Sequence, residues 1–263
     1  MNTILLTVGH GGKDSGAVAN GIREKNVTLP TALACEDYLD INHSGFEIYL
    51  TRREDEFVSL NEQIRVAREL GADLVVDIHY NSFYLKRAHG METFIAKTQL
   101  TESNKRAQRK IHDAVADYMR THDIHDRGMK RSRHYLIRHL GKSNIDAVLV
   151  EGLFLSNPRE AGIIRREQVQ KEVGYAIGRG IARHLELPEK STEPHKWPTI
   201  PLPGLARTVG VEVDGEPTDL VGLLAEIGGS YRTYLPMLDV GELTGIEVTG
   251  HGDHIKVNTK GGT

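Results

Sequence analysis

The 263-residue chain has one cysteine, few aromatic residues and almost no excess of charge of either sign. The single cysteine, Cys35, excludes a disulfide framework and argues against a cysteine-rich structural zinc site. With 33 basic and 36 acidic residues, the formal charge of −3 excludes a generally basic protein that coats nucleic acid. What is present, 39% hydrophobic and 26% charged residues, is ordinary for a globular protein with one large domain and a small appendage.

The chain also lacks long hydrophobic runs. No stretch approaches the roughly 18 apolar residues of a transmembrane helix, and the first apolar run, residues 4–8, is shorter than the hydrophobic region of a signal peptide. A glycine-rich segment, residues 9–12, follows this run directly, so removal of a leader would destroy it. The sequence therefore predicts a protein that has neither signal peptide nor transmembrane segment and is made and folded in a cytoplasm.

Proline and charge divide the chain into two parts. Five of the nine prolines lie between residues 188 and 203, and a proline-rich stretch of this kind makes a semi-rigid spacer. Residues 1–190 carry a net charge of +2, whereas residues 191–263 carry −5. We therefore predict a large domain at residues 1–187, a linker at 188–204 and a small α/β module at 205–263.

In the large domain, runs typical of strands alternate with amphipathic runs typical of helices. The predicted strands are residues 3–8, 46–50, 74–78, 91–96, 135–137 and 147–150. The predicted helices start at Lys25 and span residues 60–70, 103–119 and 169–187. This alternation predicts an α/β fold with a mostly parallel, twisted sheet flanked by helices, and such folds bind ligands beyond the carboxyl ends of their strands.

Residues able to bind metal or move protons follow three of these strands: His10, His79 and Glu151. A fourth, Glu24, precedes a predicted helix and is close in sequence to the glycine-rich segment. Two imidazoles and one carboxylate leave a tetrahedral zinc ion with an open position for water, as catalytic sites do. Each residue alone also has a structural interpretation: a glycine turn at His10, a favourable helix start at Glu24, and polar strand ends at His79 and Glu151.

Four segments place these residues in a specific context. They are residues 9–17, 23–26, 77–82 and 150–158, with further matches at 50–52, 60–67 and 90–94. In order, spacing and neighbours they resemble the zinc-dependent N-acetylmuramoyl-L-alanine amidases of the Amidase_3 family, over about residues 3–186. The resemblance implies one zinc ion per chain, bound by His10, Glu24 and His79, with Glu151 as the catalytic carboxylate.

The resemblance also implies a mechanism. Zinc-activated water attacks the lactyl carbonyl, and Glu151 accepts the proton of that water and returns it to the departing alanine nitrogen, with no covalent intermediate. Asp14 and Asn81 flank the ligands, and either can orient them by hydrogen bonds or stabilise a turn.

Two features depart from the family pattern, and a third separates the chain from the cell-division members of the family, which carry a long inhibitory insertion. Asp77 and Tyr80 stand where the family usually has serine and alanine, and we expect Tyr80 to narrow the cleft or stack on substrate. Pro30, early in the helix after Glu24, predicts a late start or a kink of that helix. Only residues 83–89 separate the second histidine motif from the next strand, which leaves no room for a long inhibitory insertion and predicts an open active site.

Other groups of polar residues carry weaker signals. The densest basic segment could hold a carboxylate of the peptide stem or be a solvated loop; it contains Arg127, Lys130, Arg131, Arg133, Arg138 and Lys142. Residues 122–126 hold two histidines and two aspartates, but their place after a helix favours a surface turn over a metal site. A hairpin turn is favoured at His251 and His254, and an inert buried side chain at Cys35.

The C-terminal module is predicted to contain strands at 209–213 and 231–235, a short helix at 220–227 and a final hairpin formed by 245–248 and 255–257. A few positions resemble copper-amine-oxidase-like stalk domains found beside cell-wall hydrolases. The module could bind the wall and so raise the local concentration of the catalytic domain. It could equally form a homodimer through exposed sheet edges.

Together these observations predict a peptidoglycan hydrolase that cleaves the amide between N-acetylmuramic acid and L-alanine and does not bind nucleic acid. The missing leader suits a phage endolysin, which accumulates in the host cytoplasm and acts on the cell wall after release; a bacterial autolysin without its leader would look the same. One alternative is a zinc peptidase that cuts within the stem peptide. The other is a wall-binding protein with an inactive amidase fold, against which the presence of all four site residues argues.

Overall fold

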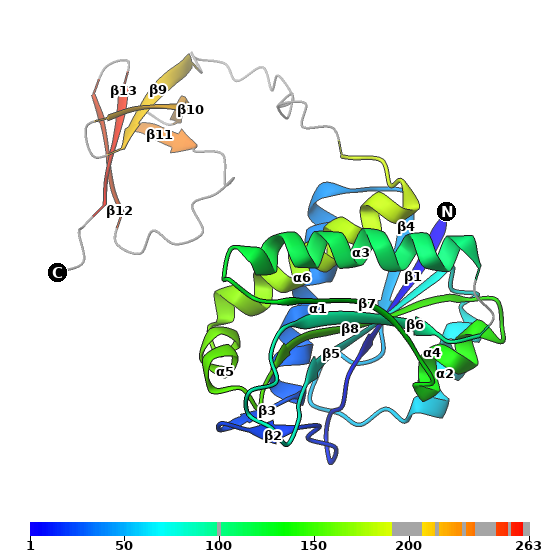
Figure 1. The fold of residues 1–263 in the computed structure, drawn as a ribbon. Helices are drawn as coiled ribbons and strands as arrows, with labels where there is room; N and C mark the ends of the chain where they lie inside the picture. The colour runs from blue at the N-terminus through cyan, green and yellow to red at the C-terminus, as the bar shows by residue number, and fades with distance from the viewer. Residues whose placement is uncertain are drawn as a thin grey trace. The chain divides into compact units, whose positions relative to one another are not determined.

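The computed structural model describes residues 1–98 and 101–190 and, further on, the backbone of strands at 207–213, 216–227, 230–234, 246–251 and 254–259 (Figure 1). The chain divides into two compact units, residues 1–191 and 192–263. Residues 189 and 190 belong to the first unit. Glu189 forms an isolated β-bridge with His43, and the Lys190 N–H donates to the Asn42 carbonyl over 2.8 Å. No helix in the described part of the chain is long and apolar enough to cross a membrane.

A six-stranded sheet forms the centre of the first unit, in the order β4-β1-β5-β8-β6-β7. Every neighbouring pair is parallel except β6 with β8, so the predicted mostly parallel sheet is confirmed. Its strands are β1 (Asn2–Val8), β4 (Phe46–Leu50), β5 (Leu74–Asn81), β6 (Met91–Ala96), β7 (Asp126–Ser132) and β8 (Asp146–Phe154). Two short strands, β2 (Val18–Ala19) and β3 (Ile22–Arg23), pair with each other.

Helices cover the two faces of this sheet unequally (Figure 1). On one face α1 (Lys25–Asn42), α3 (Glu102–Arg120) and α6 (Glu167–Leu185) pack together over the larger apolar core. On the other face α2 (Leu60–Glu69) and α4 (Tyr135–Gly141) cover a smaller core. The short α5 (Pro158–Ile164) follows β8. On this second face a cleft lies between the later residues of β5 and β8 and the starts of α2 and α4.

The alternation of side chains along the strands assigns residues to these faces. Val76 and Ile78 belong to the larger core, and Val75 belongs to the smaller one. Asp77 and His79 therefore lie on the face of α2 and α4. Leu149 on β8 also belongs to the smaller core. Glu151 lies two residues further along β8, so its side chain is on that face as well.

Several sequence-based expectations about single elements are wrong. Residues 135–137 begin the helix α4 rather than a strand, because three apolar residues are too few to reveal a period. The polar edge strand β7 has no hydrophobic pattern and was not predicted. The late start expected for α1 is wrong, because the helix begins at Lys25, and the Glu24 carbonyl accepts the N–H groups of Val27 and Thr28 in its first turn. Finally, His79 and Glu151 lie inside β5 and β8, which run on beyond them.

The described part of the second unit is a five-stranded sheet in the order β11-β10-β9-β13-β12. The strands are β9 (Arg207–Val213), β10 (Glu216–Ile227), β11 (Ser230–Tyr234), β12 (Ile246–His251) and β13 (His254–Thr259). The predicted final hairpin is confirmed, with His251 paired with His254. The predicted helix at 220–227 is wrong, because these residues continue β10. Most of the predicted linker, from residue 191 on, lies outside the described residues.

Candidate metal centre and catalytic cleft

His10 lies in the glycine-rich loop after β1. Its backbone is left-handed, with φ of 61°, which is uncommon for a residue with a side chain. Its Nδ1 is 2.9 Å from Oδ2 of Asp14. A Cβ atom on Gly16 would approach Cδ2 of His10 to 2.4 Å, so a glycine is needed there to leave room for the ring. The loop thereby fixes the imidazole and leaves Nε2 to face Glu24.

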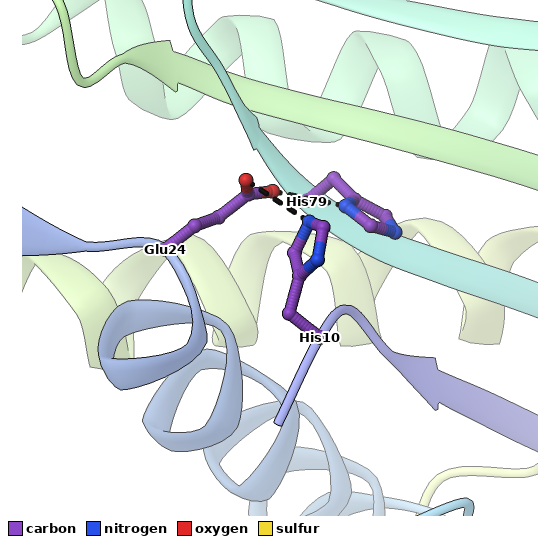
Figure 2. A group of neighbouring side chains, drawn as sticks. All are labelled: His10, Glu24 and His79. Carbon is purple, nitrogen blue, oxygen red and sulfur yellow. Dashed lines mark hydrogen bonds and ion pairs between the residues drawn. The ribbon is translucent and has the colours of Figure 1, made fainter. Parts of the chain in front are cut away.

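Glu24 immediately precedes α1, and backbone groups hold both oxygens of its carboxylate. Oε2 accepts the Ala17 N–H and Oε1 accepts the Tyr80 N–H, each over 3.0 Å. The same carboxylate meets both imidazoles, with Nε2 of His10 at 3.1 Å and Nδ1 of His79 at 2.9 Å (Figure 2). Although burial opposes ionisation, the hydrogen bonds from the two histidines hold the pKa of Glu24 well below its ordinary value.

His79 on β5 completes the cluster, and its outer nitrogen meets a second carboxylate. Nε2 lies 3.3 Å from Oδ1 of Asp77, which also accepts the Thr7 hydroxyl over 2.8 Å. Burial works against protonation, but Asp77 and Glu24 raise the pKa of His79 well above its ordinary value. Each histidine thus directs one ring nitrogen to Glu24 and the other to a separate carboxylate.

These three residues can hold a metal ion. His10, Glu24 and His79 each offer one ligand atom, and the three atoms lie within 4.8 Å of one another. Two imidazole nitrogens and a carboxylate oxygen suit zinc, and a carboxylate on the outer nitrogen is the usual way to fix the tautomer of a metal-binding histidine. Within the described ranges, no other group of three or more His, Cys, Asp or Glu side chains is placed to bind an ion.

Glu151 stands beside this cluster. It is paired in register with His79 across β8 and β5, and both line a cleft of about 780 Å³ whose wall also includes the starts of α2 and α4. Its Oε2 is buried and has no hydrogen-bond partner among the described residues. Burial raises the pKa of Glu151 to about 8; His79 opposes this rise and three neighbouring carboxylates add to it. The four residues predicted from the sequence therefore meet in one cleft.

Comparison with known proteins agrees with this arrangement. The sequence model of the Amidase_3 family, described as N-acetylmuramoyl-L-alanine amidase, matches residues 4–183. The chain belongs to this family. Its activity is accordingly that of an N-acetylmuramoyl-L-alanine amidase on peptidoglycan.

Individual relatives of the amidase cover the same part of the chain. The endolysin of Bacillus phage SPP1 is 34% identical over 189 residues, which are 72% of this chain and 68% of that protein. The amidase LytC of Bacillus subtilis is 34% identical over 182 residues, 69% of this chain and 35% of LytC. The solved catalytic domain of CwlV, an amidase from Bacillus (Paenibacillus) polymyxa, matches with a TM-score of 0.65 and 32% identity, covering 72% of this chain and all of that domain.

The side chain of Tyr80 lies in the core and not in the cleft. Its side chain is 2% exposed and lies on the opposite face of β5, where its hydroxyl is 2.7 Å from that of Thr31 on α1. A Cβ atom on Gly152 would come within 2.7 Å of the Tyr80 ring. The Tyr80 side chain therefore fills the core of the amidase, and the expectation that it narrows the cleft or stacks on substrate is wrong.

Of the two flanking polar residues, only Asp14 has contacts of both predicted kinds. Asp14 meets His10 through Oδ2, and its Oδ1 accepts the Gly16 N–H over 3.0 Å, so it supports the loop as well. Asn81 instead turns away from the metal cluster: its Nδ2 donates to Oε1 of Glu92 over 2.6 Å, and its Oδ1 accepts the N–H of the next residue.

Sequence reasoning missed Glu92, a buried carboxylate on β6 that is paired in register with Glu151. Its Oε2 accepts hydrogen bonds from Arg127, at 3.0 Å, and from Lys130. Burial opposes its ionisation, but Lys130 and Arg127 lower the pKa of Glu92. In the sequence, Glu92 is marked only by its position in segment 90–94, which is one of the segments that match the family. It could not be interpreted further, because its partners come from β5 and β7.

The other polar clusters have structural partners. His122 lies 2.9 Å from the Tyr118 hydroxyl, and Asp123 pairs with Arg159. Asp126 pairs with His112, so residues 122–126 do not converge on an ion. Cys35 is free and fully buried in the larger core, as predicted, and burial raises the pKa of its thiol far above the ordinary value.

Proposed function

We propose that His10, Glu24 and His79 bind one zinc ion and that Glu151 is the catalytic carboxylate of the amidase. Glu151 carries the proposal, because a buried carboxyl oxygen without a partner, beside a cluster of metal-binding side chains, is costly unless it serves the reaction. When bound, zinc supplies Lewis-acid polarisation of the scissile carbonyl and lowers the pKa of a water molecule.

The remaining chemistry belongs to Glu151. As the water oxygen forms its bond with the muramoyl carbonyl carbon, Glu151 accepts a proton from the water. It gives that proton to the alanine nitrogen as the carbon–nitrogen bond breaks. Burial raises the pKa of Glu151, which favours its holding the proton until it passes to the departing nitrogen. Cys35 is buried away from the cleft, so it supplies no covalent nucleophile.

We also propose where the protein acts and what its C-terminal unit binds. The similarity to the SPP1 endolysin supports a role in lysis, in which the protein accumulates in the host cytoplasm and acts on the cell wall after release. For the C-terminal unit we propose wall binding rather than formation of a homodimer. An acidic module that holds the catalytic unit near its insoluble substrate raises the effective concentration there.

Mass spectrometry of digested, purified peptidoglycan tests the reaction. We expect intact stem peptides that begin at L-alanine; their release should stop with a chelator and return with zinc. Shortened stems would identify a peptidase that cuts within the stem, and no release from several wall types would identify a wall-binding protein.

The variant Glu151→Gln tests the role of that residue. It keeps the size of the side chain and removes the proton acceptor, so activity should fall by about 10²–10⁴-fold. Zinc content, measured by elemental analysis, should stay at one per chain, because Glu151 is not among the three ligands. Unchanged activity in this variant would refute the mechanism.

A further inference from the structure

A second hollow lies beside the catalytic cleft, and Asn81 lines both. It has a volume of about 510 Å³. Its wall combines Arg87 and Arg127 and the carboxylate of Glu92 with the apolar side chains of Phe83 and Phe154. A substrate that enters the cleft at Glu151 and extends past Asn81 would therefore meet a cationic, partly aromatic surface.

Arg127 is the most firmly held cation of this hollow. Its Nε donates to Glu92 over 3.0 Å and its Nη1 donates to the His89 carbonyl over 3.2 Å. Its guanidinium carbon lies 4.9 Å from the centre of the Phe154 ring. A Cβ atom on Gly90 would come within 2.9 Å of Arg127 Cγ, so the stem of the arginine crosses the backbone where only glycine leaves room. These contacts fix the guanidinium before any ligand arrives.

A bulge in β7 gives Arg127 this position. Met91 pairs with Asp126 and Thr93 pairs with Met129, so β7 has one residue more than β6 in this interval. Residues three apart on a regular strand point to opposite faces, whereas here Arg127 and Lys130 both reach Glu92. Bulges next to active sites commonly re-aim side chains in this way.

The charges around Glu92 do not cancel. Arg127 and Lys130 share the single carboxylate of Glu92, so one positive charge is in excess. The Arg127 side chain is 31% exposed, and its hydrogen bonds to other described residues use Nε and Nη1 but not Nη2. An exposed guanidinium edge held in a fixed plane is suited to a carboxylate.

The spacing of the strands sets which part of a substrate could reach this edge. Arg127 on β7 lies two strands from Glu151 on β8, with β6 between them. Neighbouring strands are about 4.8 Å apart, which gives roughly 10 Å. An extended peptide covers at most about 3.5 Å per residue, so about three residues span the distance between the two strands. Two residues are enough to reach the Arg127 side chain itself, because it extends back to Glu92 on β6.

We propose that Arg127 binds a carboxylate of the stem peptide, at the second or third residue beyond the scissile amide, and so selects stems in which that carboxylate is free. This inference rests on the amidase function and adds a specificity-determining residue to it. The basic segment contains six cations, and this proposal gives the binding of the stem carboxylate to Arg127, which the fold holds beside the cleft.

The test uses three synthetic N-acetylmuramoyl tripeptides. In the first, the carboxylates of the second and third residues are both free; in the other two, either the second or the third residue is amidated. We expect the wild-type protein to hydrolyse the free acid with a kcat/KM about 10- to 100-fold higher than one of the amides, mainly through KM, as a charged hydrogen bond predicts. Arg127→Gln should hydrolyse the acid as slowly as the wild type hydrolyses that amide, with little further loss on the amide.

Two further variants separate recognition from support of the fold. Arg127→Lys keeps a positive charge near Glu92 but lacks the planar fork, so it should keep the wild-type melting temperature and lose most of the preference. Arg131→Gln, an exposed position on the same strand, should change neither.

Three outcomes would count against the proposal. A wild type that cleaves all three peptides equally overturns the stem-carboxylate site and leaves the amidase function intact. Equal slowing of acid and amide in Arg127→Gln assigns Arg127 to the support of Glu92 alone. A wild type that cleaves none of the peptides overturns the amidase function itself, and this proposal with it.

Discussion

Arg52 and Arg53 are neighbours in the sequence, yet their replacement by lysine should have very different effects. The Arg52 side chain is 2% exposed, whereas that of Arg53 is 60% exposed and pairs with Glu36. Arg52 donates to five acceptors, which are the carbonyl oxygens of Val8, Gly9, Lys25 and Glu54 and the hydroxyl of Thr28. It thus ties the end of β1, before His10, to the start of α1, after Glu24.

The magnitude follows from counting donors. Arg52 uses four N–H groups on three nitrogens, because Nη2 shares its two hydrogens among three acceptors. A lysine has three N–H groups on one nitrogen, so Arg52→Lys loses one donor and the spread of the fork; we expect about two acceptors to be left unsatisfied, and each such buried group costs about 1–3 kcal/mol. The Gly9 carbonyl keeps a second donor, the Thr28 hydroxyl at 2.8 Å, which places the expected loss near the lower end, at about 3 kcal/mol. For a unit of this size that is a fall in melting temperature of roughly 6–12 °C. Arg53→Lys should cost less than about 0.5 kcal/mol.

Urea denaturation of the metal-free proteins measures the free energy of unfolding, and competition with a chelator measures zinc affinity. We expect Arg52→Lys to lose both stability and affinity, because the two ligand-bearing segments are no longer held together. Arg53→Lys should match the wild type in both assays. If the two variants differ by less than 0.5 kcal/mol, the burial and hydrogen bonding of Arg52 do not have the role assigned to them.

Three further predictions concern other residues. Asp77→Asn should weaken zinc binding by about 10- to 100-fold in chelator competition, because the outer nitrogen of the second histidine loses its carboxylate, while exposed Asp113→Asn should have no effect. The pKa of Glu92 is lower in the folded than in the unfolded protein, so its contribution to stability is present above about pH 4.5 and is lost as the pH falls through the folded value; metal-free Glu92→Gln should show a flatter pH–stability curve there than the wild type. Gly174→Ala should lower stability by about 1–3 kcal/mol, because its Cβ would lie 2.3 Å from a carbonyl oxygen of α1. Gly162→Ala should raise stability by up to about 1 kcal/mol in the same denaturation assay, because this glycine is helical and has open space around it. A change of the same sign in both variants would contradict this packing.

The elements predicted correctly are those whose signal is local and repeated. The helices α2 and α3 have apolar residues every three to four positions, and β1, β5 and β8 each contain a short apolar run that is buried on both faces. The failures have equally local reasons. Residues 135–137 are too few to distinguish a helix from a strand, and β7 is an edge strand of polar and basic residues. Its place in the sheet depends on pairing with β6, which no pattern within the strand records.

The sequence by itself determined the alternation of strands and helices, the four residues of the candidate site and the family to which the chain belongs, because each is written in short segments with fixed spacing. Only the tertiary structure decided which side chains surround them. Asp77 meets His79 because alternate residues of β5 share a face, and Glu92 joins Glu151 because β6 runs antiparallel to β8. Tyr80 turns to the core although it adjoins a ligand. Such contacts join strands far apart in the chain, and their register is set by the packing of the whole sheet rather than by any one segment.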